Sequence, residues 1–264
     1  MARLLVGTSG YSYPDWVGPV YPEGTRPKDY LPLYAKRFGF VELNFSFYRQ
    51  PEAASVERLR SRAPAEFQFS AKAHRSLTHE RPADVREAAR VFLEGIRPLR
   101  ESGQLAAVLL QFPYRFHYAP ESRRHLDQVC RALEGVPLAV EFRNRDWQRE
   151  RVVAELARRG VSLVSVDLPA LPELPPPLLA PTSPMAYIRF HGRSAATWWS
   201  GDNASRYDYR YSSAELEEWA RRALEALGTL SLMIVAFNNH YRGQAVASAA
   251  EFRDLLLRRP QTGG

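Results

Sequence analysis

The sequence predicts an α/β protein that folds as a (β/α)8, TIM-barrel-like single domain over residues 1–264. Three observations support this fold. Apolar strand-like segments alternate with amphipathic helical segments, which is the order that a parallel sheet requires. Eight such strands can be counted, and a chain of about 250 residues is typical of the barrel. No G-x-G-x-x-G follows the first strand, so the dinucleotide fingerprint of the alternative, an open doubly wound sheet, is absent.

Strands are expected where short apolar runs end in polar side chains. These runs are residues 3–7, 40–48 (a strand that runs into a loop), 67–72, 105–111, 138–143, 161–166 with Asp167 at its end, 187–192 and 232–237. Helices are expected where apolar residues recur at helical spacing, at residues 28–38, 52–62, 84–101, 120–133, 148–159 and 244–258. A further helix begins at the capping box of Ser212 and Glu215. The proline-rich residues 168–184 predict an irregular connection after strand six.

Composition narrows the class of protein. No segment approaches the ~20 apolar residues of a membrane span, so no membrane partner is expected. The first strand follows the start too closely for a signal peptide, and a cytoplasmic protein is therefore expected. A single cysteine, Cys130, excludes an internal disulfide and is expected to be inert packing on a helix. The net charge of +7 permits an anionic partner such as nucleic acid, although the arginines are spread over several helices and look like solvated faces.

Polar residues gather at the ends of the predicted strands, where the active sites of barrels lie. These residues are Glu42, Asn44, Lys72, Gln111, Glu141, Arg143, Asp167, Arg189, His191 and Asn238. Three pairs (42 and 44, 141 and 143, 189 and 191) are two residues apart, so both members of each pair face the same side of the sheet. If that side is inward, the groups meet at one mouth of the barrel.

The positive and negative side chains in this set can neutralise one another's charge, and they can also act as catalytic or substrate-binding groups. Glu42, Lys72, Glu141 and His191 are the candidate catalytic residues, with a carboxylate as general acid or base. The candidate substrate-binding residues are Trp16, Asn44, Tyr48, His79, Gln111, Arg143, Asp167, Arg189, Arg193 and Asn238. Two carboxylates also permit glycoside chemistry, and a desolvated lysine permits a Schiff base. A purely structural network that closes the barrel top remains open as well.

Lysine is scarce in this chain. Only Lys28, Lys36 and Lys72 occur, and every other basic residue is an arginine. Since Lys72 falls in a predicted strand, the site is interpreted as requiring an ammonium group there. A divalent metal is not favoured and no cofactor is expected, because the cations beside His79, His191, His240 and the carboxylates would repel a metal ion.

The chain resembles the YecE-like family, also called domain of unknown function seventy-two, over almost its whole length. The segments that carry the resemblance are Gly7-Thr8-Ser9-Gly10-Tyr11, Trp16-x-Gly18-x-x-Tyr21-Pro22, Val41-Glu42-Leu43-Asn44-x-x-Phe47-Tyr48, Phe67-x-Phe69-Ser70-x-Lys72, Thr78-His79, Leu110-Gln111-Phe112-Pro113, Glu141-Phe142-Arg143 with Trp147, Arg189-Phe190-His191-Gly192-Arg193, Tyr207-Asp208-Tyr209-x-Tyr211-Ser212 and Phe237-Asn238-Asn239-His240-x-x-Gly243. The resemblance implies a TIM-barrel-like fold and supplies no activity. The chain departs from the family pattern at residues 144–146, where members often carry a histidine, and at Ser248, where they carry an asparagine.

Three functions are compatible with these residues. The first is a hydrolase-like or isomerase-like enzyme acting on a small anionic or polyhydroxylated (sugar-like) substrate at the barrel mouth. The second is a protein that binds or processes nucleic acid. The positive net charge and the aromatic segment 198–211 favour this function. The third is a non-catalytic ligand-binding scaffold. The oligomeric state is left open.

Overall fold

The strands form a closed parallel barrel in sequence order, β1 to β8, with β8 pairing back onto β1. The computed structural model describes residues 2–200 and 203–258. The strands are β1 (Arg3–Ser9), β2 (Phe40–Leu43), β3 (Gln68–Lys72), β4 (Leu105–Gln111), β5 (Leu138–Glu141), β6 (Ser162–Asp167), β7 (Met185–Phe190) and β8 (Leu232–Phe237). The predicted fold class is confirmed.

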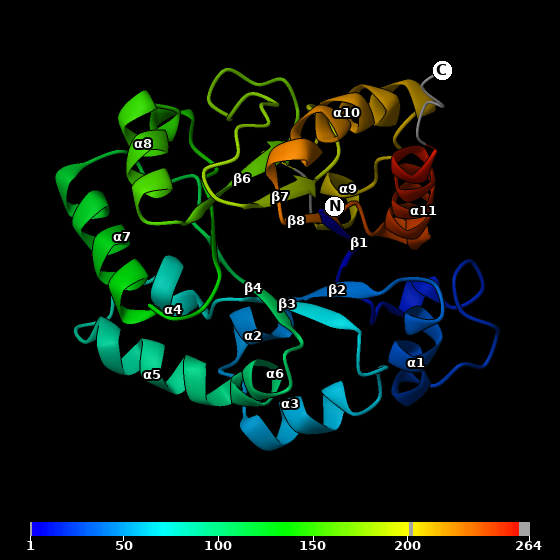
Figure 1. The fold of residues 1–264 in the computed structure, drawn as a ribbon. Helices are drawn as coiled ribbons and strands as arrows, with labels where there is room; N and C mark the ends of the chain where they lie inside the picture. The colour runs from blue at the N-terminus through cyan, green and yellow to red at the C-terminus, as the bar shows by residue number, and fades with distance from the viewer. Residues whose placement is uncertain (1, 201–202, 259–264) are drawn as a thin grey trace.

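Helices surround the strands as an outer layer (Figure 1). They are α1 (Tyr30–Ala35), α2 (Phe45–Tyr48), α3 (Ala53–Arg60), α4 (Arg75–Thr78), α5 (Val85–Gly95), α6 (Arg97–Glu101), α7 (Pro120–Ala132), α8 (Glu150–Arg158), α9 (Asn203–Arg206), α10 (Ser213–Ala226) and α11 (Gln244–Leu257). The predicted capping box is present at α10, where the Ser212 side chain accepts from the Glu215 backbone N–H and the Glu215 carboxylate accepts in return. The connection at residues 168–184 is irregular, as its prolines predicted.

The single helix predicted over residues 84–101 is wrong. The chain forms α5 and α6 instead, and Ile96 between them leaves the helical region with φ −92° and ψ 4°. Pro98 explains the break, because it has no N–H to donate to the carbonyl of the preceding turn.

A second difference from the predicted elements lies after β2, which ends at Leu43. The chain turns into the short helix α2, so Asn44 stands at the rim of the barrel.

Alternation along the strands separates the barrel interior from the layer under the helices. Inside the barrel, apolar side chains from several strands pack together: Leu5, Phe40, Ala107, Leu109, Ala139, Val164, Val166, Tyr187, Ile234 and Ala236. Their neighbours in sequence, such as Val6, Val41 and Val140, pack outward against the helices. Because side chains alternate, the same inward rows continue to Ser9, Glu42, Glu141 and Arg189.

None of the helices in the described part of the chain is long and apolar enough to cross a membrane.

Candidate active site

Glu42 lies in the barrel interior, completely buried, and three side chains bind its carboxylate through four hydrogen bonds. Arg189 Nη2 donates to Oε1 at 2.6 Å and Arg189 Nε donates to Oε2 at 2.9 Å. The Tyr187 hydroxyl donates to Oε2 at 2.6 Å, and the Ser9 hydroxyl donates to Oε1. A buried carboxylate is stable only when it is paired and hydrogen-bonded, and here β7 and β1 supply both kinds of contact.

Glu141 is the second buried carboxylate and shares Arg189 with Glu42. It accepts from Arg189 Nη1 and from Arg143 Nε, and His191 Nε2 lies 3.4 Å from its Oε1. Burial alone would raise the pKa of Glu141, but the guanidinium groups of Arg143 and Arg189 outweigh burial and hold that pKa well below its ordinary value. Glu141 is therefore ionised at neutral pH.

His191 is completely buried beneath the mouth and is neutral. Burial and the neighbouring Arg143 guanidinium lower its pKa well below the ordinary value. Its Nδ1 lies 3.1 Å from Asn238 Nδ2, which can only donate, so Nδ1 accepts and Nε2 carries the proton. This tautomer directs the N–H of His191 at Glu141.

Lys72 ends β3 and differs from the arginines around it. Its Nζ lies 4.3 Å from the centroid of the Phe47 ring, and within residues 2–200 and 203–258 it makes no hydrogen bond or ion pair. Burial, and after it the positive charge of Arg189, lower the pKa of Lys72 to about 7, against the opposing effect of Glu42 and Glu141. Near neutral pH the amine is thus divided between its charged and neutral forms.

A cavity of about 570 Å³ occupies the barrel mouth. The predicted site residues that line it are Glu42, Asn44, Tyr48, Lys72, Gln111, Arg143, Arg189 and Asn238. Tyr48 stands at its edge with 70% of its surface exposed. The convergence expected from strand alternation is therefore present for seven of these residues, all except Tyr48, which lies on α2.

Six predicted site residues are not among the described residues that line this cavity: Trp16, His79, Glu141, Asp167, His191 and Arg193. Glu141 and His191 lie directly beneath it, in contact with Arg143. Trp16 is fully buried, and its indole N–H donates to the His240 carbonyl at 2.7 Å.

Asp167 and Arg193 form a separate network on the helix side of the sheet. Arg193 Nη2 donates to Asp167 at 2.6 Å, and the Trp219 indole N–H of α10 donates to the same oxygen at 2.6 Å. The Tyr211 hydroxyl donates to Asp167 at 2.8 Å. Val164 and Val166 face the barrel interior, so the next residue in the strand, Asp167, must face outward.

His79 lies beside the mouth, with its ring edge-on to Phe47 at 4.7 Å between centroids. Burial and the nearby charge of Lys72 lower the pKa of His79 to about 4, so it is neutral at physiological pH. Its Nδ1 lies 2.9 Å from the Thr78 hydroxyl.

Several residues of the cavity were not predicted, namely Gly10, Tyr11, Ser12, Tyr13, Leu43, Phe45, Tyr207 and His240. Tyr13 stacks on His240 with ring centroids 4.4 Å apart, which joins the loop after β1 to the loop after β8. The hydroxyl-rich and aromatic composition of the first loop was the available signal.

Asn44 has an unused hydrogen-bonding atom at this site. Its Nδ2 donates to the Ser9 hydroxyl at 2.9 Å, whereas its Oδ1 is buried and has no donor among the described residues.

No group of three or more His, Cys, Asp or Glu side chains that could hold a metal ion occurs in the described ranges.

The two departures from the family pattern have structural roles. Asn144 Oδ1 accepts from the Asp146 backbone N–H at 2.8 Å, and its Nδ2 donates to the Tyr114 carbonyl at 3.0 Å. Asn144 therefore fixes the loop after β5. Ser248 on α11 accepts from Asn239 Nδ2 at 3.5 Å.

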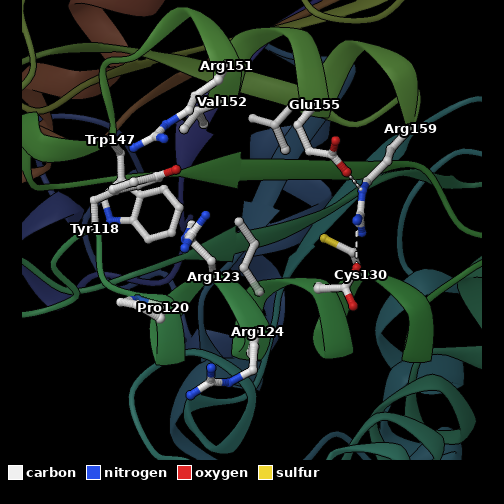
Figure 2. Close-up of a pocket in the computed structure, with 13 residues that line it drawn as sticks. Tyr118, Pro120, Arg123, Arg124, Cys130, Trp147, Arg151, Val152, Glu155 and Arg159 are labelled. Carbon is white, nitrogen blue, oxygen red and sulfur yellow. Dashed lines mark hydrogen bonds and ion pairs between the residues drawn. The ribbon is translucent and has the colours of Figure 1, made fainter.

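A second cavity, of about 500 Å³, lies outside the barrel between α7 and α8 (Figure 2). Its lining combines the apolar side chains of Trp147 and Val152 with arginines such as Arg123 and Arg151. No strand-end residue predicted for the site is among the described residues that line it. Chemistry in a barrel is expected at the carboxyl ends of the strands, so the cavity at the mouth is the candidate active site.

Cys130, at the edge of the outer cavity, should be unreactive in the folded protein. Burial raises the pKa of its thiol to about 12, and thiol reagents attack the thiolate. Labelling with a chromogenic disulfide near pH 8 should be at least ~100-fold slower in the native protein than in urea, because native thiolate is scarce and enclosed. Cys130→Ser provides the blank. Equal rates in buffer and in urea would show that this thiol is accessible.

Comparisons with known proteins identify the family of this chain. The family model described as "Protein of unknown function DUF72" matches residues 5–263. The UPF0759 protein YunF of Bacillus subtilis (strain 168) is 31% identical over 269 residues, which cover 96% of this chain and 94% of the relative.

Solved structures show the same fold. A DUF72 family protein from Thermotoga maritima MSB8 superposes with a TM-score of 0.90 and 37% identity, covering 97% of this chain and 100% of that one. A DUF72 family protein from Enterococcus faecalis V583 gives a TM-score of 0.86 at 27% identity, covering 98% and 96% of the two chains. The resemblance seen in the sequence motifs is thereby confirmed, and the chain belongs to the DUF72 family.

Proposed function

We propose that this protein is an enzyme that acts on a small anionic or polyhydroxylated substrate in the cavity at the barrel mouth, with Lys72 as its acid–base group. The observation that carries the proposal is the Lys72 amine, which lines the cavity and has no hydrogen-bonding partner within the described residues. A group with a pKa of about 7 can both give and accept a proton at neutral pH.

The proton-transfer role expected of Glu42 and Glu141 passes to Lys72 in this proposal. Both carboxylates are bound by guanidinium groups, and the pKa of Glu141 lies well below its ordinary value. A glycosidase-type acid must instead hold a proton near neutral pH, so Glu141 does not suit that role. Glu42, Glu141 and His191 are better suited to holding Arg143 and Arg189 in position.

Arg143 supports the binding of an anion. It donates through Nε to Glu141, and its Nη2 lies 3.3 Å from the acceptor Nδ1 of His191, while its Nη1 makes no hydrogen bond within the described ranges. Nη1 carries two N–H donors, and guanidinium groups suit carboxylate and phosphate oxygens. The amide side chains of Gln111 and Asn238, and the phenol of Tyr48, line the same space and suit hydroxyl groups.

Replacing Lys72 with methionine should weaken binding of inorganic phosphate at pH 6 by at least tenfold, or ~1.4 kcal/mol. The ammonium lines the cavity and has no hydrogen-bonding or ion-pair partner among residues 2–200 and 203–258, so its removal takes away charge that is available to a ligand. Isothermal titration calorimetry with phosphate, and then with a sugar phosphate, measures the change.

Two variants control this experiment. Lys36→Met removes an exposed ammonium elsewhere and should leave affinity unchanged. Lys72→Arg keeps a permanent charge, so its affinity should persist as the pH rises through about 7, where that of the wild type falls. Equal affinity in Lys72→Met and wild type would contradict the proposal.

The nucleic-acid alternative remains an untested prediction. The aromatic segment 198–211 that favoured it includes residues 201–202, which lie outside the described residues. Binding of this kind would show a steep dependence on salt concentration.

A further inference from the structure

Lys72 combines three properties that bear on the reactivity of its amine. Its amine faces a cavity of about 570 Å³, large enough for a small metabolite. It packs on the ring of Phe47 at 4.3 Å and has no acceptor in the described part of the chain. Burial and neighbouring cations lower its pKa to about 7, so much of the amine is neutral under physiological conditions. A neutral, accessible amine is a nucleophile.

We infer that the Lys72 amine forms an imine with a small anionic carbonyl compound, either a 2-oxo acid or a phosphorylated aldehyde or ketone. This inference rests on the proposed function and names its substrate class. The carbonyl carbon meets Nζ of Lys72, and the carboxylate or phosphate meets Nη1 of Arg143, which has no hydrogen bond within the described residues.

The step balances without an oxidant or reductant. The Nζ lone pair forms a bond to the carbonyl carbon, the carbonyl π electrons move to oxygen, and that oxygen takes up the proton that nitrogen loses. The resulting hydroxyl leaves as water with the second proton that nitrogen loses, while the nitrogen electron pair forms the C=N bond. Amine and carbonyl compound therefore give imine and water.

Asn44 can assist the intermediate that carries a hydroxyl group. Its Oδ1 is buried, lacks a donor among the described residues and belongs to a side chain that lines the same cavity. A hydroxyl group on the former carbonyl carbon can donate to this oxygen. The ligand would thereby satisfy a buried acceptor that the described side chains leave unpaired.

The scarcity of lysine makes the inference directly testable. Lys28 and Lys36 are exposed, so the chain carries its own internal comparison of lysine reactivity. The protein is incubated near pH 7 with glyoxylate, dihydroxyacetone phosphate or acetone, then reduced with borohydride, which fixes an imine as a stable secondary amine. Peptide mass spectrometry reports the modified position and separates lysine adducts from any at the terminal amine.

Lys72 should be modified at least tenfold faster than Lys28 and Lys36, and the anionic carbonyl compounds should react at least tenfold faster than neutral acetone. The glyoxylate and dihydroxyacetone phosphate arms distinguish a 2-oxo acid from a phosphorylated ketone. Labelling of Lys72 no faster than Lys36 with both anionic probes would overturn the inference.

Phosphate binding separates this inference from the proposed function. Lys72→Arg keeps the charge but cannot form an imine at neutral pH, so it should bind phosphate and give no adduct at residue 72. If wild type binds phosphate through Lys72 yet forms no adduct, only the imine is rejected. If phosphate binding is also insensitive to Lys72→Met, the proposed function fails as well.

Discussion

Replacing Arg189 with methionine should lower the free energy of unfolding by roughly 3–5 kcal/mol. Arg189 is 1% exposed and binds both buried carboxylates, Glu42 and Glu141. Methionine fills a similar volume but leaves two carboxylates in the barrel interior without their shared guanidinium. The loss is therefore dominated by buried charge that has lost its partner, rather than by a cavity.

Urea denaturation followed by circular dichroism measures this change, and Arg75→Met is the matched control. Arg75 forms an exposed pair with Glu80, with Nε 2.9 Å from Oε1. The same chemical change at that exposed pair should cost ~1 kcal/mol or less. A loss at Arg189 no larger than the loss at Arg75 would show that the interior carboxylates do not depend on this guanidinium.

Neutralising one carboxylate should recover part of the stability lost with Arg189. Glu42→Gln in the Arg189→Met background removes the buried charge that has lost its guanidinium partner, whereas Glu141 keeps Arg143, and Tyr187 and Ser9 can still bond the amide. Glu42→Gln in the wild-type background should instead destabilise, because Arg189 then loses a charged partner. Opposite signs in the two backgrounds would demonstrate the coupling between residues 42 and 189.

The inward residues could be predicted because they follow strand alternation. Glu42 on β2 required a partner, and its partners Arg189 and Tyr187 come from β7. Period-two alternation fixes which residues of each strand face inward, and closure of the barrel then brings the strands together. Alternation counted from Val164 and Val166 would also have directed Asp167 outward.

Depth and loop paths could not be predicted in this way. His191 faces inward as expected, yet it lies below Arg143 and against Asn238, so it does not line the cavity within the described residues. The spacing of residues along a strand predicts whether a side chain faces inward, but not how far along the barrel axis it lies. Tyr13 and His240 come from loops whose paths depend on tertiary contacts such as their mutual stacking, and no periodic pattern reports such contacts.

Lys72→Met should be more stable than the wild type below pH 7, and this advantage should shrink as the pH rises. The pKa of Lys72 is about 7 in the folded protein against an ordinary value of 10.5. Between these values the unfolded chain holds more protons at this residue than the native protein, so native stability increases with pH. Below pH 7 the native amine must be charged within its apolar contact with Phe47, and the full cost of burying that charge applies.

The difference in unfolding free energy between wild type and Lys72→Met should therefore change by up to ~1.4 kcal/mol per pH unit between about pH 7 and pH 10. Other titrating groups are common to both proteins and cancel in the difference. Urea melts at several pH values measure it, with the exposed Lys36→Met as the control whose difference from wild type stays flat. A flat difference at Lys72 as well would mean that its ammonium is solvated or paired in solution. An amine held in that way would supply neither the acid–base group nor the nucleophile assigned to residue 72.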